Sequence, residues 1–514
     1  MRRAVARLSG ATPGPTARGF TGRAAGGFTG PVPRPGAGRG AGWRARPAVS
    51  LAALAVLAVI AALVTGCTSG ASSPAATSVS RSASGLAAAS VSGATPTSPA
   101  SPASQAEAVP VLPSRALASP GCSAATAASP PLGSVHTETL AAGTAPFGVA
   151  ATPDGRWAFA AVADAVDVLR LGAVSGATSA PLATLVRSVP LPVRPLGATV
   201  TPDGKYLLLA ARNGALVVSV ARAEAGSPGA VLGTLAVPAG TRGAGPSTGP
   251  SDSSSAIEVT VSPDGRFAFV TLEYADEAVV FNLAGALGHG FGPADYVGAI
   301  PLGDAAVGMA VSPDGRWLYA TSEVAVAGQL PAGLATPGGC TGRVPGTATD
   351  EPPGALSVID LARAETDPAH SVVATVAAGY QPVRVVTSAD GSQVWVTSRA
   401  SDDLLCFSAA RLAADPARAL VAIVRVGSEP VGLAAVRHGA LIVVADSNRF
   451  AASGASSALS VVNVAAALAG RPAVTGQIST GMFPRDMTVS PDGTLLVSDF
   501  SSGQVQAIGT ASLP

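Results

Sequence analysis

Residues 257–270 read Ile-Glu-Val-Thr-Val-Ser-Pro-Asp-Gly-Arg-Phe-Ala-Phe-Val and predict a β-hairpin. Apolar residues alternate with others on both sides of the Ser-Pro-Asp-Gly turn at 262–265, as expected for strands of a sheet. Proline fixes φ at the first central turn position, aspartate tolerates the second, and glycine supplies the left-handed residue that follows. This hairpin decides the fold because it recurs along the chain.

Seven copies of the turn follow one another between residues 152 and 493. Successive copies are 49, 61, 50, 76, 48 and 54 residues apart. A four-stranded blade of a β-propeller needs about 40–50 residues, so each step accommodates one blade and its loops. The turns lie at 152–155, 201–204, 262–265, 312–315 and 490–493, with degenerate copies at 388–391 and 436–439.

The two ends of the array predict how the ring closes. Residues 135–140 look like a fourth strand with no blade before it, and residues 503–508 look like a third strand with no fourth after it. Pairing these segments would complete the last blade and remove the open edges. The Ser-Pro-Asp-Gly-Arg repeats resemble the YVTN-type, lactonase-like seven-bladed propellers over about residues 134–509, and that resemblance implies an all-β, seven-bladed propeller.

Charge is distributed unevenly along the chain. Nine arginines and no acidic residue lie in 1–47, whereas the residues after 66 carry 23 basic and 31 acidic side chains. A main body of this sign argues against nucleic acid as a partner. Lys205 is the only lysine, and this arginine-biased composition resembles that of proteins from high-GC actinobacteria.

The N-terminal region predicts export and membrane attachment. A basic low-complexity segment (1–47) precedes an apolar run (48–66) that ends Leu-Val-Thr-Gly before Cys67. This ending resembles a bacterial lipobox, which implies cleavage before Cys67 and lipidation of its thiol. A single transmembrane helix is the alternative, because the run is near the ~20 residues that a bilayer requires. Both interpretations place the rest of the chain on the extracytoplasmic side of the cell membrane.

A Ser/Ala/Thr/Pro-rich stretch (67–133) cannot bury enough apolar surface to fold and is predicted to be a flexible tether to the propeller at 134–514. Two long insertions interrupt the array, at 240–255 and 324–353. Cys122 and Cys340 lie in Gly/Pro-flanked loops, and a disulfide between them would join the tether to the second insertion. Cys406 lies within an apolar strand and is expected to be buried. No Cys/His spacing typical of a metal site occurs in the sequence.

The candidate site follows from the innermost strands, which line the channel of a propeller. The position five residues before each turn proline, or its equivalent, should face the channel, and so should the position two residues further on. The positions between them should pack between blades. The first column contains Gly148, Gly197, Glu258, Gly308, Arg384, Gly432 and Asp486, the second Ala150, Thr199, Thr260, Ala310, Val386, Ala434 and Thr488, and the intervening column Val149, Ala198, Val259, Met309, Val385, Leu433 and Met487.

Glu258, Arg384 and Asp486 thus stand out among glycines and have two interpretations. In one, Arg384 binds a carboxylate, phosphate or lactone carbonyl while a carboxylate acts as a base or metal ligand. In the other, Arg384 neutralises the two acids in a water-filled channel. Arg485 lies beside Asp486 and is expected to reach the same mouth. Polar residues of the loops between second and third strands are expected to form a solvated rim; they include Glu273, Arg399, Asp402, Asp403, Asp446, Asn448, Arg449 and Asp499.

Three functions follow from this pattern. The first is a non-enzymatic lipoprotein of the cell envelope that binds a small molecule or a protein, without a metal or another cofactor. The second is a lactonase-like hydrolase that uses Arg384 with Glu258 or Asp486, and the third is a metal or small-molecule sensor. None of the four histidines falls on an inner-strand position, and no Gly-x-Ser-x-Gly or phosphate-loop motif accompanies the repeats. We therefore expect binding rather than catalysis.

Overall fold

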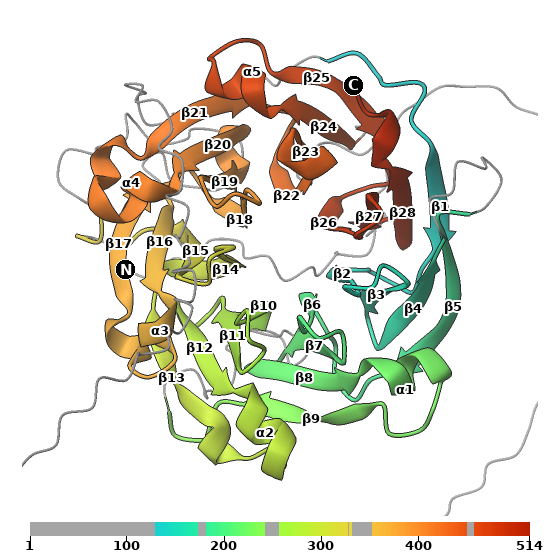
Figure 1. Ribbon diagram of the computed structural model, residues 1–514, viewed down its shortest axis with the longest axis vertical. Helices are drawn as coiled ribbons and strands as arrows, with labels where there is room; N and C mark the ends of the chain where they lie inside the picture. The colour runs from blue at the N-terminus through green and yellow to red at the C-terminus, as the bar shows by residue number, and fades with distance from the viewer. Residues whose placement is uncertain (1–128, 173–180, 242–255, 327, 331–351, 450–456) are drawn as a thin grey trace, which may run out of the picture. The chain divides into compact units, whose positions relative to one another are not determined.

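Seven four-stranded antiparallel sheets are arranged around a common axis in the computed structural model (Figure 1). The structure describes residues 129–172, 181–241, 256–326, 328–330, 352–449 and 457–514. The predicted seven-bladed all-β propeller is confirmed. The predicted basic segment, the apolar run, nearly all of the tether and Cys67, Cys122 and Cys340 lie outside the described residues.

Each blade is built from strands that pair in chain order from the axis outward. Blades 1 to 3 are β2 (Val149–Ala151), β3 (Trp157–Val162), β4 (Ala165–Leu171) and β5 (Ala183–Pro190); β6 (Ala198–Val200), β7 (Tyr206–Ala211), β8 (Gly214–Ser219) and β9 (Val231–Ala236); and β10 (Ala256–Val261), β11 (Phe267–Leu272), β12 (Glu277–Asn282) and β13 (Tyr296–Pro301). Blades 4 to 6 are β14 (Asp304–Val311), β15 (Trp317–Val324), β16 (Ala355–Asp360) and β17 (Val372–Ala377); β18 (Pro382–Thr387), β19 (Gln393–Ser398), β20 (Asp403–Ser408) and β21 (Leu420–Arg425); and β22 (Pro430–Val436), β23 (Leu441–Asp446), β24 (Ala458–Asn463) and β25 (Val474–Ser479).

The seventh blade joins the two ends of the array, as predicted. It consists of β26 (Pro484–Val489), β27 (Thr494–Asp499), β28 (Gln504–Gly509) and, outermost, β1 (Thr137–Ala141). Figure 1 shows β1 in cyan beside β28 in dark red. The chain just before β1 also pairs with blade 6: Leu132 N donates to Gln477 O at 2.7 Å, and Gln477 N donates to Pro130 O at 2.9 Å. The N-terminal chain therefore holds two neighbouring blades together.

The repeated turn is held by a side-chain network that explains its sequence. Ser262 Oγ donates to Asp264 Oδ1 at 2.6 Å and accepts from Phe267 N at 3.0 Å, while Gly265 has φ +73°. The degenerate copy at Ser388 keeps the same network. In the sixth blade Arg437 and His438 are themselves left-handed, with φ of 53° and 54°, so this turn differs from the others.

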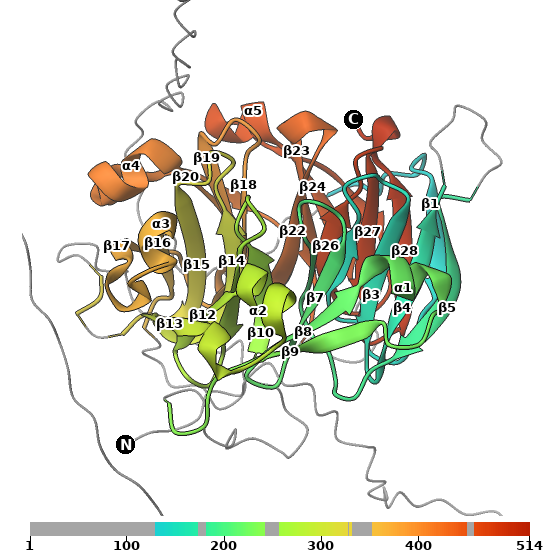
Figure 2. The same ribbon diagram turned by 60° about the horizontal axis from the view of Figure 1, so that its bottom comes forward.

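Short helices follow the third strands of five blades and were not predicted from the sequence. They lie at the circumference of the ring (Figures 1 and 2). The end of the strand supplies their cap: Asn282 Oδ1, for example, accepts from Gly285 N at 2.9 Å. The helices are α1 (Val220–Ala225), α2 (Leu283–His289), α3 (Leu361–Ala364), α4 (Ala409–Ala414) and α5 (Val464–Leu468), with 3₁₀ turns at η1 (Pro293–Asp295), η2 (Pro368–His370), η3 (Arg399–Ser401), η4 (Pro416–Arg418), η5 (Arg437–Gly439) and η6 (Thr510–Ser512).

The core is divided among the seven interfaces between blades. One apolar cluster fills each interface, and each cluster contains one residue of the column predicted to pack there. Cys406 is fully buried in the cluster between blades 5 and 6, as predicted. The aromatic residue two positions after the turn glycine also packs into these clusters, as Trp157 and Trp317 do. Apolar burial between blades therefore stabilises the ring.

Hydrogen bonds near the axis join each blade to the next. In blades 1 and 2 the joint is direct: Gly148 N donates to Leu196 O at 3.1 Å, and Gly197 N donates to Ile257 O at 2.9 Å. The strands approach so closely there that a Cβ on Gly148 would lie 2.6 Å from Leu196 O. Close approach between blades thus requires these inner glycines.

Between the other blades described below, a side-chain hydroxyl of the second strand links the two inner strands, accepting a hydrogen bond from one and donating a hydrogen bond to the other. We call this arrangement the hydroxyl relay. Thr397 Oγ1 accepts from Arg384 N at 3.1 Å and donates to Val431 O at 2.7 Å. The same relay uses Ser498 between Asp486 N and Phe147 O. Thr271 and Thr321 occupy the equivalent positions in blades 3 and 4. The inner strands that carry the predicted site are consequently fixed by hydrogen bonds on both sides.

Candidate functional site

Two faces of the ring are distinguished by their connections. We call the face with the hairpin turns the turn face, and the opposite one, where second strands lead into third strands, the loop face. The inner strands run from the loop face to the turn face.

The channel is closed near the loop face by a ring of residues, one from each blade. We call it the channel ring, and it contains the residue that directly precedes each position of the first predicted column. Six members are apolar and form one buried cluster with Phe483, whereas the seventh is an arginine. The members are Phe147, Leu196, Ile257, Val307, Val383, Val431 and Arg485.

Glu258, Arg384 and Asp486, here called the charged trio, meet one residue further toward the turn face. Arg384 Nη2 lies 3.1 Å from Glu258 Oε2, and Arg384 Nε lies 3.7 Å from Asp486 Oδ1. Arg384 Nη1 also donates to Val307 O at 3.2 Å, and Asp486 Oδ2 accepts from Val149 N at 3.0 Å. The sequence-predicted trio therefore comes together from blades 3, 5 and 7, and Arg384 forms ion pairs with both acids.

Burial governs the protonation of this trio. The carboxyl groups share one neighbouring guanidinium in a site that excludes most water. Burial raises the pKa of Glu258 to about 8, an effect that Arg384 opposes and Asp486 reinforces. Burial also raises the pKa of Asp486 above its ordinary value, although Arg384 and the backbone N–H of Val149 oppose the rise. A pKa of about 8 means that Glu258 retains its proton at neutral pH.

Arg485 has quite different surroundings. Its guanidinium carbon lies 3.7 Å from the ring centre of Phe147, 5.2 Å from that of Phe483 and 5.4 Å from that of Phe500. We call these three residues the phenylalanine cage. The Nε and Nη1 atoms of Arg485 are buried, and no described residue accepts a hydrogen bond from either of them. Burial, together with the charges of Arg449 and Arg384, lowers the pKa of Arg485 well below its ordinary value.

The solvated rim that the sequence suggested is present only in part among the described residues. Asp164 and Arg212, in blades 1 and 2, are exposed, whereas charged side chains of the later loops are buried. Glu273, Arg399 and Asp402 are almost completely buried. Arg399 Nη2 lies 2.9 Å from Glu323 Oε2 and donates to Gln381 Oε1 at 2.7 Å. These loops pack against neighbouring blades, so charged side chains that a loop position would normally expose are enclosed here.

Two further acids on this face have raised pKa values. Burial raises the pKa of Asp446 to about 8, although a 2.6 Å hydrogen bond from Ser460 Oγ opposes the rise. Burial raises the pKa of Asp499 to about 6. Thr480 Oγ1 donates to Asp499 Oδ1 at 2.8 Å. Both acids end second strands, and both already accept hydrogen bonds from their own blades.

Strained backbone conformations surround the entrance on the loop face. In five blades the residue two positions before the member of the channel ring is left-handed: Ala145, Ala305, Gln381, Glu429 and Phe483 have φ of 51°, 54°, 50°, 54° and 55°. Non-glycine residues in this conformation cost about 1–3 kcal/mol each and cluster at functional sites. Because the conformation recurs at the equivalent position of five blades, it belongs to the repeated connection into the inner strand and does not mark a single site.

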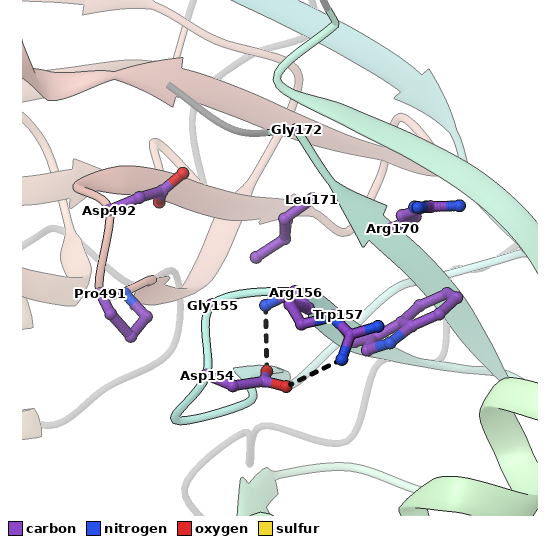
Figure 3. A pocket seen from close by; sticks show the side chains of 9 residues that line it. All are labelled: Asp154, Gly155, Arg156, Trp157, Arg170, Leu171, Gly172, Pro491 and Asp492. Atoms are coloured by element: carbon purple, nitrogen blue, oxygen red, sulfur yellow. Dashed lines mark hydrogen bonds and ion pairs between the residues drawn. The ribbon is translucent and has the colours of Figure 1, made fainter. Parts of the chain in front are cut away.

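A pocket on the turn face is a weaker candidate. It measures about 610 Å³ and lies between the turns of blades 1 and 7 (Figure 3). Asp154 Oδ1 accepts from Thr152 Oγ1 at 2.5 Å and from Arg156 N at 3.0 Å, so its carboxylate already serves the hairpin turn. Trp157 stacks with Arg170 at 6.0 Å. The polar groups that line this pocket therefore already interact with one another or with their own hairpin turn.

The four histidines lie away from the channel. His136 precedes β1 at the circumference, His289 ends α2, His370 lies in η2 and His438 lies in the turn of blade 6. Within the part of the chain that the structure describes, no group of three or more His, Cys, Asp or Glu residues could hold a metal ion. None of the described helices is long and apolar enough to cross a membrane.

Comparison with known proteins finds a family that part of the chain resembles. Residues 132–328 match the family described as "Lactonase, 7-bladed beta-propeller". The chain is similar to this family over that part of its propeller. The match ends within blade 4, so it includes Glu258 of this propeller but neither Arg384 nor Asp486. The match therefore concerns part of the propeller and leaves the chemistry of the channel to the residues themselves.

Solved structures contain similar propellers. One is the hydrazine synthase of Kuenenia stuttgartiensis, which has a TM-score of 0.50 and 17% sequence identity and covers 71% of this chain and 96% of its own. At this identity the likeness concerns the fold alone. No curated protein matches the chain.

Proposed function

We propose that this propeller is a ligand-binding module of the cell envelope that binds its ligand without turning it over. The observation that carries the proposal is the contrast between two buried arginines. Arg384, the arginine that a hydrolase would use, forms ion pairs with Glu258 and Asp486. Arg485 presents hydrogen-bond donors that no described residue accepts. The arrangement of the two arginines thus favours binding of a ligand over its chemical conversion.

Attachment to the membrane is part of the same proposal. The apolar run and Cys67 would anchor the chain, and the predicted tether of about 60 residues would reach roughly 40 Å as a flexible coil. The described chain joins the ring along the outer edge of blade 6, at Pro130–Leu132. Attachment at the circumference leaves the channel entrance available to a ligand or to a partner protein.

A thermal-shift screen of the full-length chain in detergent tests binding. The panel contains divalent ions, sugar lactones and cell-wall fragments. A ligand at 100 times its Kd should add about 2.7 kcal/mol of stability, which a melting curve resolves. A shift produced by one compound class supports the proposal. No shift across the panel, together with no partner captured by surface cross-linking, contradicts it.

Mass spectrometry of the purified chain tests the anchor. Lipidation at Cys67 predicts loss of residues 1–66, added acyl mass and failure of both events in a Cys67→Ser variant. A retained N-terminus without acyl mass would contradict the lipid anchor and favour a single membrane-spanning helix.

A lactonase-like hydrolase is the second candidate, and one observation favours it. Glu258, with its pKa raised to about 8, and the Asp486 carboxylate flank one guanidinium, so an acid and a base stand together. Hydrolysis of sugar lactones by the wild-type chain and by Arg384→Ala tests this candidate. Turnover that disappears in the variant while the melting temperature is unchanged would establish the hydrolase. Loss of stability without any wild-type turnover would exclude it for that substrate class.

A further inference from the structure

We propose that Arg485 and the phenylalanine cage form a binding site for a small monocarboxylate with an apolar body. The inference rests on the proposed binding function and adds the place and the chemical class of the ligand. It follows from the contacts of one side chain and from the channel ring in which that side chain lies.

The donors of Arg485 are the first observation. The side chain is only 2% exposed, and its Nε and Nη1 have no acceptor among the described residues. A buried hydrogen-bond donor without a partner is costly, and native proteins rarely retain one. Nε–H and the Nη1 hydrogens point to opposite sides of the planar guanidinium, so one carboxylate can accept from only one of these two atoms, together with Nη2. An anion bound to the Nη1–Nη2 edge would remove the part of the cost that belongs to Nη1.

The shape of the cage is the second observation. Phe147 covers one face of the guanidinium at 3.7 Å from its ring centre, and stacking of this kind leaves the N–H edge free. The fork of donors matches the two oxygens of a carboxylate. The edge, rather than the face, of Arg485 is therefore the surface that a ligand would meet.

The charge around Arg485 is the third observation. Arg384, Arg399 and Arg449 act on it as like charges, and Glu273 opposes them. The guanidinium of Arg449 also lies 5.4 Å from the ring centre of Phe483, on the same cage. Because these arginines together act more strongly on Arg485 than Glu273 does, an anion is favoured over a cation or a neutral molecule.

The rest of the channel ring limits the ligand to a single charge. The six other members are apolar, so a second charge on the ligand would lie among Leu196, Val307 and similar side chains without solvation. An aromatic or branched aliphatic body would instead be buried against them. A monocarboxylate such as benzoate fits this combination, whereas a phosphate dianion does not.

Phe500 marks the point of entry. Phe147 and Phe483 are buried, whereas Phe500 is half-buried and packs against both, with ring centres 6.4 Å and 5.3 Å away. It follows Asp499 at the loop-face end of β27. A ligand would reach Arg485 by displacing this ring from its place over the guanidinium.

Calorimetric titration of the full-length chain with benzoate tests the site, with benzamide as the uncharged analogue of the same shape. We expect benzoate to bind and benzamide not to bind. The Arg485→Leu variant places in the ring the same kind of side chain as Leu196, and it should weaken benzoate binding at least about 100-fold because two charge-assisted hydrogen bonds are lost. Arg418→Leu, at an exposed arginine of η4, is the matched control and should bind as the wild type does.

Two further variants keep the test informative if Arg485→Leu fails to fold. Arg485→Lys retains the charge and loses the fork, so benzoate binding should weaken about tenfold. Phe500→Ala opens the entrance, so association should become faster while binding still requires Arg485. Wild-type affinity for benzoate in Arg485→Lys and in any folded Arg485→Leu protein would overturn the assignment.

The outcomes also separate this inference from the proposed function. If cell-wall fragments shift the melting curve but benzoate does not bind, the carboxylate site is wrong and the binding module stands. If nothing in either set binds, both fail. Binding of a peptide through its free terminal carboxylate, without benzoate binding, would overturn the small-molecule assignment in favour of a peptide partner.

Discussion

Arg384 and Arg485 emerge from neighbouring levels of the same channel, and both are buried, yet their surroundings are opposite. Arg384 forms ion pairs with two carboxyl groups and donates to a backbone carbonyl, although its Nε has no hydrogen-bond acceptor among the described residues. Arg485 meets three aromatic faces and no described acceptor at two of its nitrogens. A buried charge is retained at a stability cost unless it is paired. The comparison teaches that ion pairs within the fold account for the burial of Arg384. The burial of Arg485 is accounted for by the ligand that we propose.

The largest expected effect comes from removing the paired arginine. Arg384→Ala leaves two buried acids facing each other, and we expect the free energy of unfolding at pH 7 to fall by about 3–5 kcal/mol. Denaturant unfolding of the full-length chain measures this. Arg418→Ala, which breaks the exposed ion pair with Asp415, should cost no more than about 1 kcal/mol. Equal losses in the two variants would show that the trio contributes no more than a surface pair.

Removing the unpaired arginine should act in the opposite direction. Arg485→Leu replaces an uncompensated buried charge by the kind of side chain found at the other ring positions. We expect an unchanged or higher free energy of unfolding, by up to about 4 kcal/mol, in the absence of any ligand. A large loss of stability in this variant would mean that Arg485 stabilises the folded state. The two arginines would then have the same role, which contradicts the comparison.

The hydroxyl relay beneath Arg384 offers a third test. Thr397→Val removes the acceptor of Arg384 N and the donor to Val431 O without changing the side-chain volume. Leaving buried backbone groups without partners should cost about 1–3 kcal/mol. Thr397→Ser should retain most of the stability, because Ser498 performs the same role in blade 7. Matching losses in the valine and serine variants would disprove the relay.

The pH dependence of stability sharpens the assignment of the proton in the trio. The pKa of Glu258 is about 8 in the folded chain, above its ordinary value of 4.5, so the folded state retains a proton that the unfolded state releases. Stability should therefore fall as the pH rises from about 5 to 8. Glu258→Gln should reduce this slope by at most about 1.4 kcal/mol per pH unit.

Asp446 and Asp499 also have raised pKa values, so the Gln variant should retain part of the slope. Denaturant unfolding at several pH values measures both slopes. Identical slopes in the wild type and in Glu258→Gln would show that Glu258 is ionised in the folded chain.

Much of the fold could be predicted because it depends on local rules. The Ser-Pro-Asp-Gly turns fix where strands reverse, and the blade period fixes which strands are innermost. Period-two alternation then places Glu258, Arg384 and Asp486 on the channel side, where the structure brings them together. The short helices were missed, although a cap such as Asn282 at the end of a third strand could have indicated them.

The site around Arg485 required the structure because it depends on contacts between blades. Adjacency to Asp486 suggested that Arg485 shared the place of the trio, whereas the structure puts it among Phe147, Phe483 and Phe500. A sequence observation could have helped: the residue before the first column is apolar in six repeats and arginine in the seventh. The burial of Glu273 and Arg399 could not be predicted, since loop sequences do not show what packs over them.

The most direct test of the account is a crystal structure of the full-length protein with 4-bromobenzoate, in which anomalous scattering locates the bromine. The account predicts one bromine position beside the phenylalanine cage, a carboxylate on Nη1 and Nη2 of Arg485, and a displaced Phe500 ring. A bromine among Glu258, Arg384 and Asp486, with the Arg384 ion pairs broken, would contradict it and return the channel to the hydrolase interpretation.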